Sequence, residues 1–533
     1  MLNNGMNYNR AAITANPGSK ESRRARSIKK PVNTTVKTLR SMYGGRPDTI
    51  FFQYPEYCGE VRDEAGTTEF SQQAFKKLGY SLTFKVTGST HIYNSIVNSM
   101  KMAGFQMVTG SNWNMLWTGI PRPDTIKNAC KFQKINHYPS TMQIGRKDNM
   151  WRNIFRMKRK HGKDYDICPK TYIFPEDHKR FKMDREGEKK SVLYILKPAA
   201  LSCGRGIRII GKNSNVRRRK GYVASKYIHK PHLINGFKYD LRIYVLVTSF
   251  DPLRVYMYDE GLVRFATEKY STKKSALKKR FVHLTNYSVN KKASDYKRND
   301  MNDDNEDSNS KWNFTMLKKY YKKMGIPVKE VFSGIKDVII KSLISIEPHI
   351  ANNYNRYSKH KNTCFEVYGF DVIIDSSLKA WILEVNVCPS FSSSSYLDKK
   401  VKTMMLCDAF HCVGFMPFDR KKLDKEEEEQ AKNRLLGFDK NKEASKTKSV
   451  ARLDGEIKDF KNQVENLSKA DITMLMEYDE ELSRKGHYEA IFPKQSNIKA
   501  YEKFFECQRY NNVLLWSYIK HGKSVNLGKY LNH

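Results

Sequence analysis

The stretch VYGFDVIIDSSLKAWILEVNV, residues 367–387, contains two apolar runs separated by a short Asp-Ser-Ser segment. Asp and Ser are common in turns because their side chains hydrogen-bond to nearby backbone groups. We therefore predict a β-hairpin whose turn is centred just before Leu378. In that register Asp371 lies directly opposite Glu384 on the neighbouring strand. Asn386 shares the face of Glu384, because side chains on a strand repeat every two residues.

The second strand of this hairpin also predicts which side chains are buried. Leu383, Val385 and Val387 alternate with Glu384 and Asn386. Successive side chains on a strand point to opposite faces, so we expect the three apolar side chains to form one buried face. The carboxylate and the amide then point away from that face.

The predicted acidic pair has two interpretations. Residues directly opposite each other in antiparallel strands have Cβ atoms roughly 5 Å apart. Asp371 and Glu384 would repel at that separation, and a bound cation would allow both to stay ionised. Mg²⁺ suits such oxygen ligands, because proteins hold it through one or two carboxylates together with substrate phosphates. The alternative is a hairpin edge that faces water, where acidic residues are ordinary. The residues by themselves leave both interpretations open.

The segment YILKPAALSCGRGIRII, residues 194–210, is typical of a loop that approaches phosphate. Lys197 ends an apolar strand, and Gly204-Arg205-Gly206 precedes a second strand. Glycines let backbone N–H groups come close to phosphate oxygens, while lysine and arginine add positive charge. The spacing matches neither a Walker A loop nor a dinucleotide-binding fingerprint.

A third polar pattern lies in GFKYDLRIYVLVTS, residues 236–249, where Lys238, Asp240 and Arg242 alternate with apolar residues. The three side chains therefore project from one face of a strand, and a solvated face of an edge strand is the alternative. The polar segment HLTNYSVNKK follows at residues 283–292. Together with the lysine, the glycine loop and the acidic pair, these features indicate a nucleotide site. The sequence contains no HExxH motif and no evident Ser-His-Asp or Cys-His arrangement, so phosphoryl chemistry fits better than covalent hydrolysis.

Length and composition indicate a folded chain of two to four domains. The 533 residues are 39% hydrophobic and 12% aromatic, which is enough for a large core. No apolar run approaches the roughly 18 residues of a membrane helix, and the first residues lack the apolar centre of a signal peptide. The nine cysteines are scattered without a CxxC pair, which favours reduced thiols. We therefore expect a soluble, intracellular protein.

The charge is the most unusual property of the sequence. A formal net charge of +40 predicts an acidic partner: nucleic acid, an anionic membrane surface, or a protein rich in Asp and Glu. Charge alone does not choose among these three. No recognised module for reading nucleic acid is visible in the sequence, which makes that partner the weakest of the three.

Composition changes along the chain predict five segments and an α/β (α+β) fold. Residues 1–48 are polar and basic and are expected to form a disordered arm. Residues 49–190 mix aromatic strands with helix-like stretches, and residues 191–415 are rich in strands. Residues 416–470 read as a charged linker or exposed helix, and residues 471–533 as a helical extension.

Six motifs, in this order along the chain, resemble the tubulin–tyrosine-ligase-like proteins, which are ATP-grasp ligases that add amino acids to proteins. The resemblance covers roughly residues 85–415, and the motifs are QIGRKDNMWRN, ILKPAALSCGRGI, YIHKPHLINGFKYDLRIYVLVTS, DPLRVYMYDEGLVRFAT, HLTNYSVNKK and YGFDVIIDSSLKAWILEVNVCPS. The block at residues 472–512 is similar to the tail of one glutamylase branch, the tubulin polyglutamylase 4 type.

This resemblance implies an ATP-grasp ligase fold. N-terminal and central subdomains would occupy residues 49–190, the ATP-grasp catalytic domain residues 191–415, and a C-terminal helical extension residues 471–533. It also implies two cofactors, ATP and Mg²⁺, and a monomer that does not bind membranes.

The resemblance further assigns roles to residues of this sequence. It implies Mg²⁺ ligation by Asp371, Glu384 and Asn386, and catalytic roles for Lys197, Arg242 and Glu384. The residues implied to hold the incoming glutamate are Arg264, Ser288, Lys311 and Lys402. The residues implied to contact ATP are Lys147, Lys197, Arg205, Gly206, Ile207, Ser225, Lys226, Tyr227, Ile228, Lys238, Tyr239, Asp240, Thr285 and Asn286. Two positions depart from the family pattern, in which glutamine usually stands at Ser225 and glycine at Arg208.

By this resemblance the chain is expected to be a tubulin polyglutamylase. It would join free L-glutamate through an amide bond to side-chain carboxylates of tubulin tails, with an acyl phosphate as intermediate. The same ligase could instead use glycine or tyrosine, and a non-catalytic basic protein that binds microtubules is the alternative from another class. Other acidic proteins are further possible partners. We expect a cytoplasmic protein associated with the cytoskeleton, in a cilium or basal body as a further option.

Overall fold

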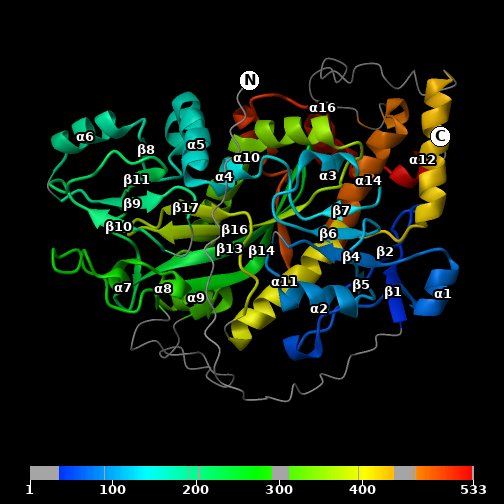
Figure 1. Cartoon of the computed structure of the whole chain (residues 1–533), viewed down its shortest axis with the longest axis horizontal. Coiled ribbons are helices and arrows are strands. Elements are labelled where there is room, and N and C mark those ends of the chain that lie inside the picture. Colours follow the sequence, from blue (N-terminus) through cyan, green and yellow to red (C-terminus); the bar gives the residue numbers. More distant parts are fainter. Residues whose placement is uncertain are drawn as a thin grey trace, which may run out of the picture. The chain divides into compact units, whose positions relative to one another are not determined.

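The centre of the fold is a seven-stranded antiparallel sheet (Figure 1). The computed structural model describes residues 35–88, 90–189, 191–201, 204–290, 311–393, 395–436, 460 and 464–530. The strands of the sheet are β12 (Leu233–Ile234), β13 (Phe237–Phe250), β14 (Leu253–Phe265), β15 (Lys311–Asn313), β16 (Glu366–Ile374), β17 (Ala380–Asn386) and β18 (Tyr488–Phe492). Strand β13 lies between β14 and β16 and is buried along nearly its whole length, as expected of a central strand with a long apolar run.

The hairpin of β16 and β17 confirms the predicted pairing of Asp371 with Glu384, but the register is interrupted. Close to the turn, Val372 pairs with Ile382, so one residue, Leu383, is left over between the two registers. An extra residue of this kind is a β-bulge, and it reverses which side chains face the core. Ile382 and Val385 are therefore buried while Leu383 is partly exposed. The expectation that Leu383 belongs to the buried face is wrong for this reason.

A second, four-stranded antiparallel sheet lies beside the first (Figure 1). Its strands, in spatial order, are β10 (Arg208–Ile210), β9 (Tyr194–Pro198), β11 (Tyr222–Lys226) and β8 (Thr171–Phe174). Alternate side chains, including Tyr194 and Leu196, pack around Phe181 of helix α6 (His178–Gly187) on one face. Because β8 precedes residue 190, the predicted boundary between residues 190 and 191 falls inside this sheet and needs correction.

The amino-terminal part of the described chain forms two further small sheets. One is antiparallel and contains β1 (Thr35–Leu39), β2 (Thr49–Ile50) and β3 (Thr67–Ser71). The other is parallel and contains β4 (Thr83–Val86), β5 (Gln106–Met107), β6 (Met115–Trp117) and β7 (Lys134–Ile135). Val36 and Thr38 of β1 are buried. The predicted arm at residues 1–48 therefore ends too late, and residues 1–34 of it lie outside the described part.

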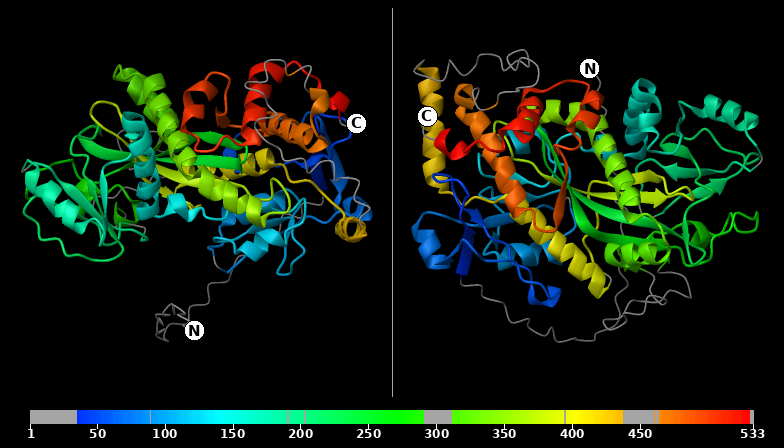
Figure 2. Two further views of the ribbon diagram at one scale, coloured as in Figure 1. Left: turned by 90° about the horizontal axis from the view of Figure 1, so that it is seen from above. Right: turned by 180° about the vertical axis from the view of Figure 1, so that it is seen from behind.

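Helices cover both faces of the central sheet (Figure 2). Helix α10 (Val328–Tyr357) packs on the face that carries Leu241, Ile243 and Val245. Helix α11 (Tyr396–Val413) packs on the face that carries Tyr244 and Leu246. None of the described helices combines the length and apolar character needed to span a membrane. The other α-helices of the described chain are α1 (Gln72–Lys77), α2 (Asn94–Met102), α3 (Pro123–Lys127), α4 (Met142–Gly145), α5 (Lys147–His161), α7 (Arg280–His283), α8 (Tyr287–Asn290), α9 (Phe314–Lys323), α12 (Arg420–Leu435), α14 (Lys469–Arg484), α15 (Ile498–Tyr501) and α16 (Tyr510–Ser517).

The carboxy-terminal segment is part of the core, and it contains a strand as well as helices. Its strand β18 pairs with β14, and its helix α14 starts with a capping box in which Ser468 and Asp471 bond each other's backbone N–H groups. The segment predicted as a linker, residues 416–470, contains helix α12. Residues 437–459 and 461–463 of that segment lie outside the described part.

A buried carboxylate on α14 joins this segment to the central sheet. Glu481 accepts hydrogen bonds from Thr248 Oγ1 at 2.8 Å and from the Tyr256 hydroxyl at 2.9 Å. Its other oxygen lies 3.4 Å from Nη2 of Arg254, which is only 1% exposed. Arg254 thus depends on Glu481 for a countercharge inside the protein.

We predict that Glu481→Ala lowers the free energy of unfolding by about 3–5 kcal/mol, because it leaves a buried guanidinium without its carboxylate. Urea denaturation of the variant and the parent chain measures the difference. Glu428→Ala is the matched control, since Glu428 is exposed on α12 and should change stability by less than about 0.5 kcal/mol. Equal stability of the Glu481 variant and the parent would contradict the structural role given to this carboxylate.

Candidate active site

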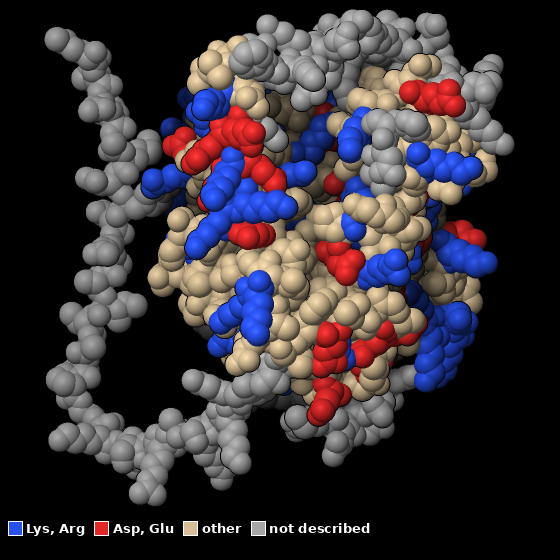
Figure 3. Space-filling view, turned by 90° about the vertical axis from the view of Figure 1, so that its right-hand side faces the viewer, with Lys and Arg blue, Asp and Glu red and all other residues tan. Residues whose placement is uncertain are grey.

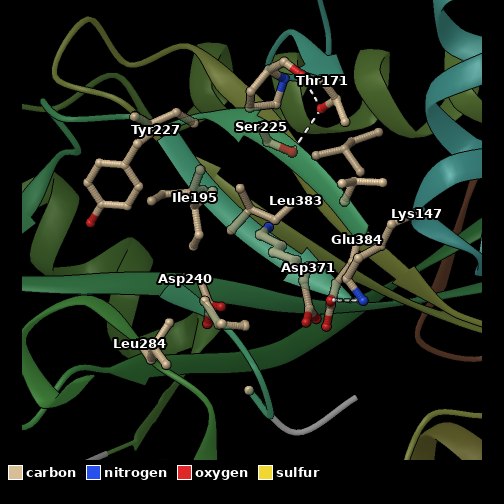
Figure 4. Close-up of a pocket in the computed structure, with 18 of the residues that line it drawn as sticks. Lys147, Thr171, Ile195, Ser225, Tyr227, Asp240, Leu284, Asp371, Leu383 and Glu384 are labelled. Atoms are coloured by element: carbon tan, nitrogen blue, oxygen red, sulfur yellow. Dashed lines mark hydrogen bonds and ion pairs between the residues drawn. The ribbon is translucent and has the colours of Figure 1, made fainter. Parts of the chain in front are cut away.

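A cavity lies between the central sheet and the sheet formed by β8, β9, β10 and β11 (Figure 4). Strands β8, β9 and β11 form one wall, and β13, β16 and β17 form the other. The glycine loop and the segment 283–286 close its sides. The cavity is open to solvent, and both apolar and charged side chains line it.

A row of charged side chains crosses the floor of this cavity. Arg242 on β13 lies opposite Asp371 on β16, and Asp371 lies opposite Glu384 on β17. Arg264 on β14 lies opposite Asp240 on β13. As the alternation in the sequence predicted, Lys238 and Asp240 both line this cavity. Arg242 does not line it but forms an ion pair with Asp371, which does.

Two arginines hold the carboxylate of Asp371. Arg242 donates from Nε to Oδ1 at 2.6 Å, and Arg264 Nη2 lies 2.9 Å from Oδ2. Arg264 also binds Asp240 through two bonds of 2.7 and 2.6 Å. Burial of Asp371, which is 2% exposed, would raise the pKa of this carboxyl, but the two guanidiniums outweigh burial and keep the pKa well below its usual range. Asp371 is therefore ionised at neutral pH.

Glu384 is held by a lysine from another element. Nζ of Lys147, at the start of α5, lies 2.9 Å from Glu384 Oε2, as Figure 4 shows. Lys197 on β9 lines the same part of the cavity. Burial lowers the pKa of Lys197, and nearby Lys147 lowers it further while Glu384 opposes both effects. Glu384 thus lies close to lysines from α5 and from β9.

Lys238 on β13 also lines the cavity, and polar groups surround its ammonium. Its Nζ donates to the Tyr227 hydroxyl and to the backbone oxygen of His283, each at 3.0 Å. Burial lowers the pKa of Lys238 to about 7, although Asp240 favours the charged form. Burial and the nearby Lys238 lower the pKa of the His283 imidazole to about 4, so this ring is neutral at pH 7.

The glycine loop has a backbone shape that other residues would not adopt easily. Gly204 and Gly206 have φ angles of 66° and 70°, in the left-handed region that favours glycine. A Cβ on Gly206 would also lie 2.9 Å from Cγ of Pro198. These glycines allow the loop to pass close to the strand that carries Lys197.

Most residues that the sequence analysis assigned to the site line this cavity. Ser225 is among them, and its Oγ lies 2.8 Å from Thr171 Oγ1 (Figure 4). The assigned residues that line the cavity are Lys147, Lys197, Arg205, Ile207, Ser225, Lys226, Tyr227, Ile228, Lys238, Asp240, Thr285, Asn286, Asp371 and Glu384.

The other assigned residues lie outside the cavity lining. Gly206 belongs to the glycine loop. Arg242 and Arg264 form ion pairs with Asp371, which itself lines the cavity. Asn386 donates its side-chain N–H to the backbone oxygen of Gly369 at 3.2 Å. Its side-chain amide oxygen takes no part in this hydrogen bond.

The side chains of Tyr239 and Lys402 do not line the cavity. Tyr239 points to the opposite face of β13, where its hydroxyl lies 2.9 Å from His232 Nδ1. The reason is strand alternation, since its neighbours Lys238 and Asp240 take the cavity face. Lys402, on α11, is buried beside Asp398 with its Nζ 2.8 Å from Oδ1. Ser288 lies in α8 and Lys311 in β15, and the structure does not describe their side chains.

Sequence reasoning missed the apolar walls of the cavity. Ile195, Ile373 and Leu383 line it, and the first two stand two residues from Lys197 and Asp371 on the same strands. Period-two alternation could therefore have identified Ile195 and Ile373. Leu383 reaches the cavity because of the bulge, and Thr171 carries no sequence signal of its role.

The acidic pair is suited to a hard cation. Asp371 and Glu384 offer carboxylate oxygens on adjacent strands, and Asn386 offers an amide oxygen one pair further along. No cluster of three or more His, Cys, Asp or Glu residues with metal-binding geometry occurs in the described part of the chain. Two carboxylates fit Mg²⁺ that completes its shell with phosphate and water, and they fit zinc poorly.

The fold and the site together define an ATP-grasp-like architecture, with a cavity between two antiparallel sheets and a glycine loop at its side. The model of the Tubulin-tyrosine ligase family matches residues 125–423, and the chain belongs to this family. The matched region contains every strand that lines the cavity.

Three relatives show the range of similar proteins. The tubulin monoglutamylase TTLL4 of Homo sapiens is 33% identical over 520 residues, which are 93% of this chain and 42% of that protein. The tubulin polyglutamylase TTLL5 of Mus musculus is 34% identical over 460 residues, 82% of this chain and 34% of that protein. The tubulin polyglutamylase ttll6 of Danio rerio is 36% identical over 420 residues, 78% of this chain and 51% of that protein. The chain thus spans about a third to a half of the length of these relatives.

Lys238 should make stability depend on pH in a defined direction. Its pKa is about 7 in the folded protein, against about 10.4 for an unfolded lysine. Between these values the unfolded state binds one proton more, so this group makes the free energy of unfolding rise with pH. Lys238→Met removes that contribution, and its stability relative to the parent should fall steadily from pH 7 to pH 9.5.

Urea denaturation of both chains at each pH measures this difference. Lys269→Met is the control, since Lys269 is exposed and its substitution should produce a difference that does not change with pH. A flat difference for the Lys238 variant would show that this lysine keeps an ordinary pKa in the fold.

Proposed function

We propose that this chain is an ATP-dependent ligase that joins glutamate to side-chain carboxylates of glutamates in tubulin tails. The observation that carries the proposal is the charged row formed by Arg242, Asp371 and Glu384 beside the lysines of the glycine-loop sheet. Lysines attract anionic phosphates and carboxylates attract a divalent cation, so this cavity suits a nucleoside triphosphate with Mg²⁺. The names of the relatives support glutamate as the amino acid and tubulin as the acceptor.

The reaction requires two successive transfers at the mouth of this cavity. An oxygen of the acceptor carboxylate attacks the γ-phosphorus of ATP, which forms an acyl phosphate and releases ADP. The neutral α-amine of free glutamate then attacks the acyl carbon. The carbon–oxygen bond to phosphate breaks, the amine loses a proton, and an amide and inorganic phosphate result.

The residues of this chain bind and position the reactants. Lys197 and Lys238 would neutralise phosphate oxygens from the two sheets, and Arg205 would do so from the loop. Asp371, Glu384 and Asn386 would hold Mg²⁺, which when bound offsets charge on the phosphates. Arg242 and Arg264 keep the carboxylate of Asp371 ionised and fixed in orientation. Correct positioning provides most of the acceleration in such transfers.

The proposal that glutamate is the transferred amino acid rests on the names of the relatives and not on one side chain of this protein. Arg264, which the sequence analysis assigned to glutamate, already pairs with Asp240 and Asp371. Glycine and tyrosine are therefore the alternatives within the same reaction class. The relatives are named as both monoglutamylases and polyglutamylases, so the proposal covers the first glutamate and later ones alike.

The positive charge gives a reason for an acidic acceptor. A net charge of +40 attracts glutamate-rich tails and other acidic proteins, and the attraction should weaken with salt. On the face that carries α1 and α12, Lys and Arg are interspersed with Asp and Glu (Figure 3). We propose that the protein works as a monomer on the cytoskeleton, in the cytoplasm or in cilia.

Glu384→Gln should abolish transfer while microtubule binding and its salt dependence persist. The substitution keeps the shape and removes one carboxylate, so we expect at least a 100-fold loss, beyond the roughly 10–100-fold cost of losing an outer metal partner. Purified protein with ATP, microtubules and labelled glutamate, glycine or tyrosine measures transfer. Glu428→Gln, at an exposed position, is the control and should be fully active. Label from glycine alone would overturn the choice of glutamate, and an active Glu384 variant would overturn the mechanism.

ATP binding should be coupled to protonation of Lys238. The pKa of this lysine is about 7 in the free protein, and a bound phosphate favours the charged form. At pH 8 we therefore expect proton uptake on binding and an affinity that falls as the pH rises. Calorimetry in buffers of different ionisation enthalpy measures the uptake. Lys238→Met should bind ATP more weakly and take up fewer protons, and unchanged uptake would exclude Lys238 as its source.

A further inference from the structure

The sheet that carries the glycine loop has a second cleft on its other face. Side chains on this outer face pack under α6 in one region, around Phe181. Beyond α6 the face opens into a cleft. The residues that line this cleft are Phe174, Leu196, Gly206, Ile207, Arg208, Asn215, Arg217, Arg219, Tyr222 and Arg280.

Four arginines from three parts of the chain meet in this cleft. Arg208 comes from β10, Arg217 and Arg219 from the connection between β10 and β11, and Arg280 from α7. No Asp or Glu is among the lining residues. The guanidinium of Arg219 lies 4.9 Å from the centre of the Tyr222 ring, and Arg280 donates to the backbone oxygen of Gly204 at 2.8 Å. In the described part of the chain neither Arg208 nor Arg217 has an ion-pair partner.

The arginine cleft is distinct from the nucleotide cavity. Arg208 pairs with Leu196 on β9, so the two side chains share the outer face. Lys197, the next residue, points to the opposite face and lines the cavity. The glycine loop separates the two spaces, and Ile207 lines both of them. The proposed reaction therefore leaves these four arginines without a role.

We propose that the arginine cleft binds a carboxylate-rich peptide segment, namely a part of the acidic acceptor that lies outside the catalytic cavity. Guanidinium groups bind carboxylates through paired hydrogen bonds. Four of them around one open cleft suit a ligand that carries several separate carboxylates, and Phe174, Leu196 and Tyr222 supply an apolar floor for its chain. This inference rests on the proposed function, because that function supplies the acidic acceptor.

Binding of fluorescently labelled decaglutamate tests the cleft directly. Arg217→Ser with Arg219→Ser removes two charges from the lining, and we expect the affinity to fall about fivefold or more. Arg218→Ser with Lys220→Ser is the matched control, since it removes the same charge from the same connection at positions that do not line the cleft. The control should retain most of the affinity. Equal losses in both variants would overturn the proposal in favour of general attraction to a basic protein.

A transfer assay separates this inference from the proposed function. With a long glutamate-rich acceptor peptide, the Arg217 and Arg219 double variant should show a raised KM and an unchanged kcat. With a short acceptor that holds one glutamate, both double variants should match the parent. Absence of transfer by the parent would overturn the proposed function, whereas equal KM values on the long acceptor would overturn the cleft alone. Displacement of decaglutamate from these arginines by tighter-binding single-stranded DNA would show a nucleic-acid site and overturn the proposal.

Discussion

The pairing of Asp371 with Arg242 and Arg264 is the interaction on which the site depends. A carboxylate that is only 2% exposed stays ionised because two guanidiniums offset the cost of burial. The three residues come from β16, β13 and β14, so the same contact fixes three strands of the central sheet. The orientation and the ionised state of this carboxylate are thus fixed by the fold itself.

The two sheets contribute different residues to the cavity. The central sheet carries the acidic residues, while the smaller sheet contributes Lys197, the hydroxyl of Ser225 and the glycine loop. Lys147, from the start of α5, crosses to Glu384 and links the acidic side to a helix. Both sheets therefore contribute charged side chains to the cavity, and neither sheet alone forms the site.

The sequence predicted the elements that have a strong local pattern. The pairing of Asp371 with Glu384 followed from turn chemistry and from strand alternation, and the shared face of Lys238 and Asp240 followed from alternation alone. The bulge at Leu383 could not be predicted, because it depends on how β17 packs against its neighbours. Tyr239 was placed among the ligand contacts by its position in a motif, although alternation puts its side chain on the other face. The strand β1 was missed because five residues of a basic segment give little periodicity.

The carboxy-terminal strand also has a consequence for how the protein can hold a flexible polypeptide. Strands β15 and β18 pair with the two ends of β14, and Asp259 between them donates its backbone N–H to His487. Backbone groups along this border are therefore already occupied, and a disordered tail cannot join the sheet there as an additional strand. A polypeptide that contacts this border would therefore do so through side chains and not by strand addition.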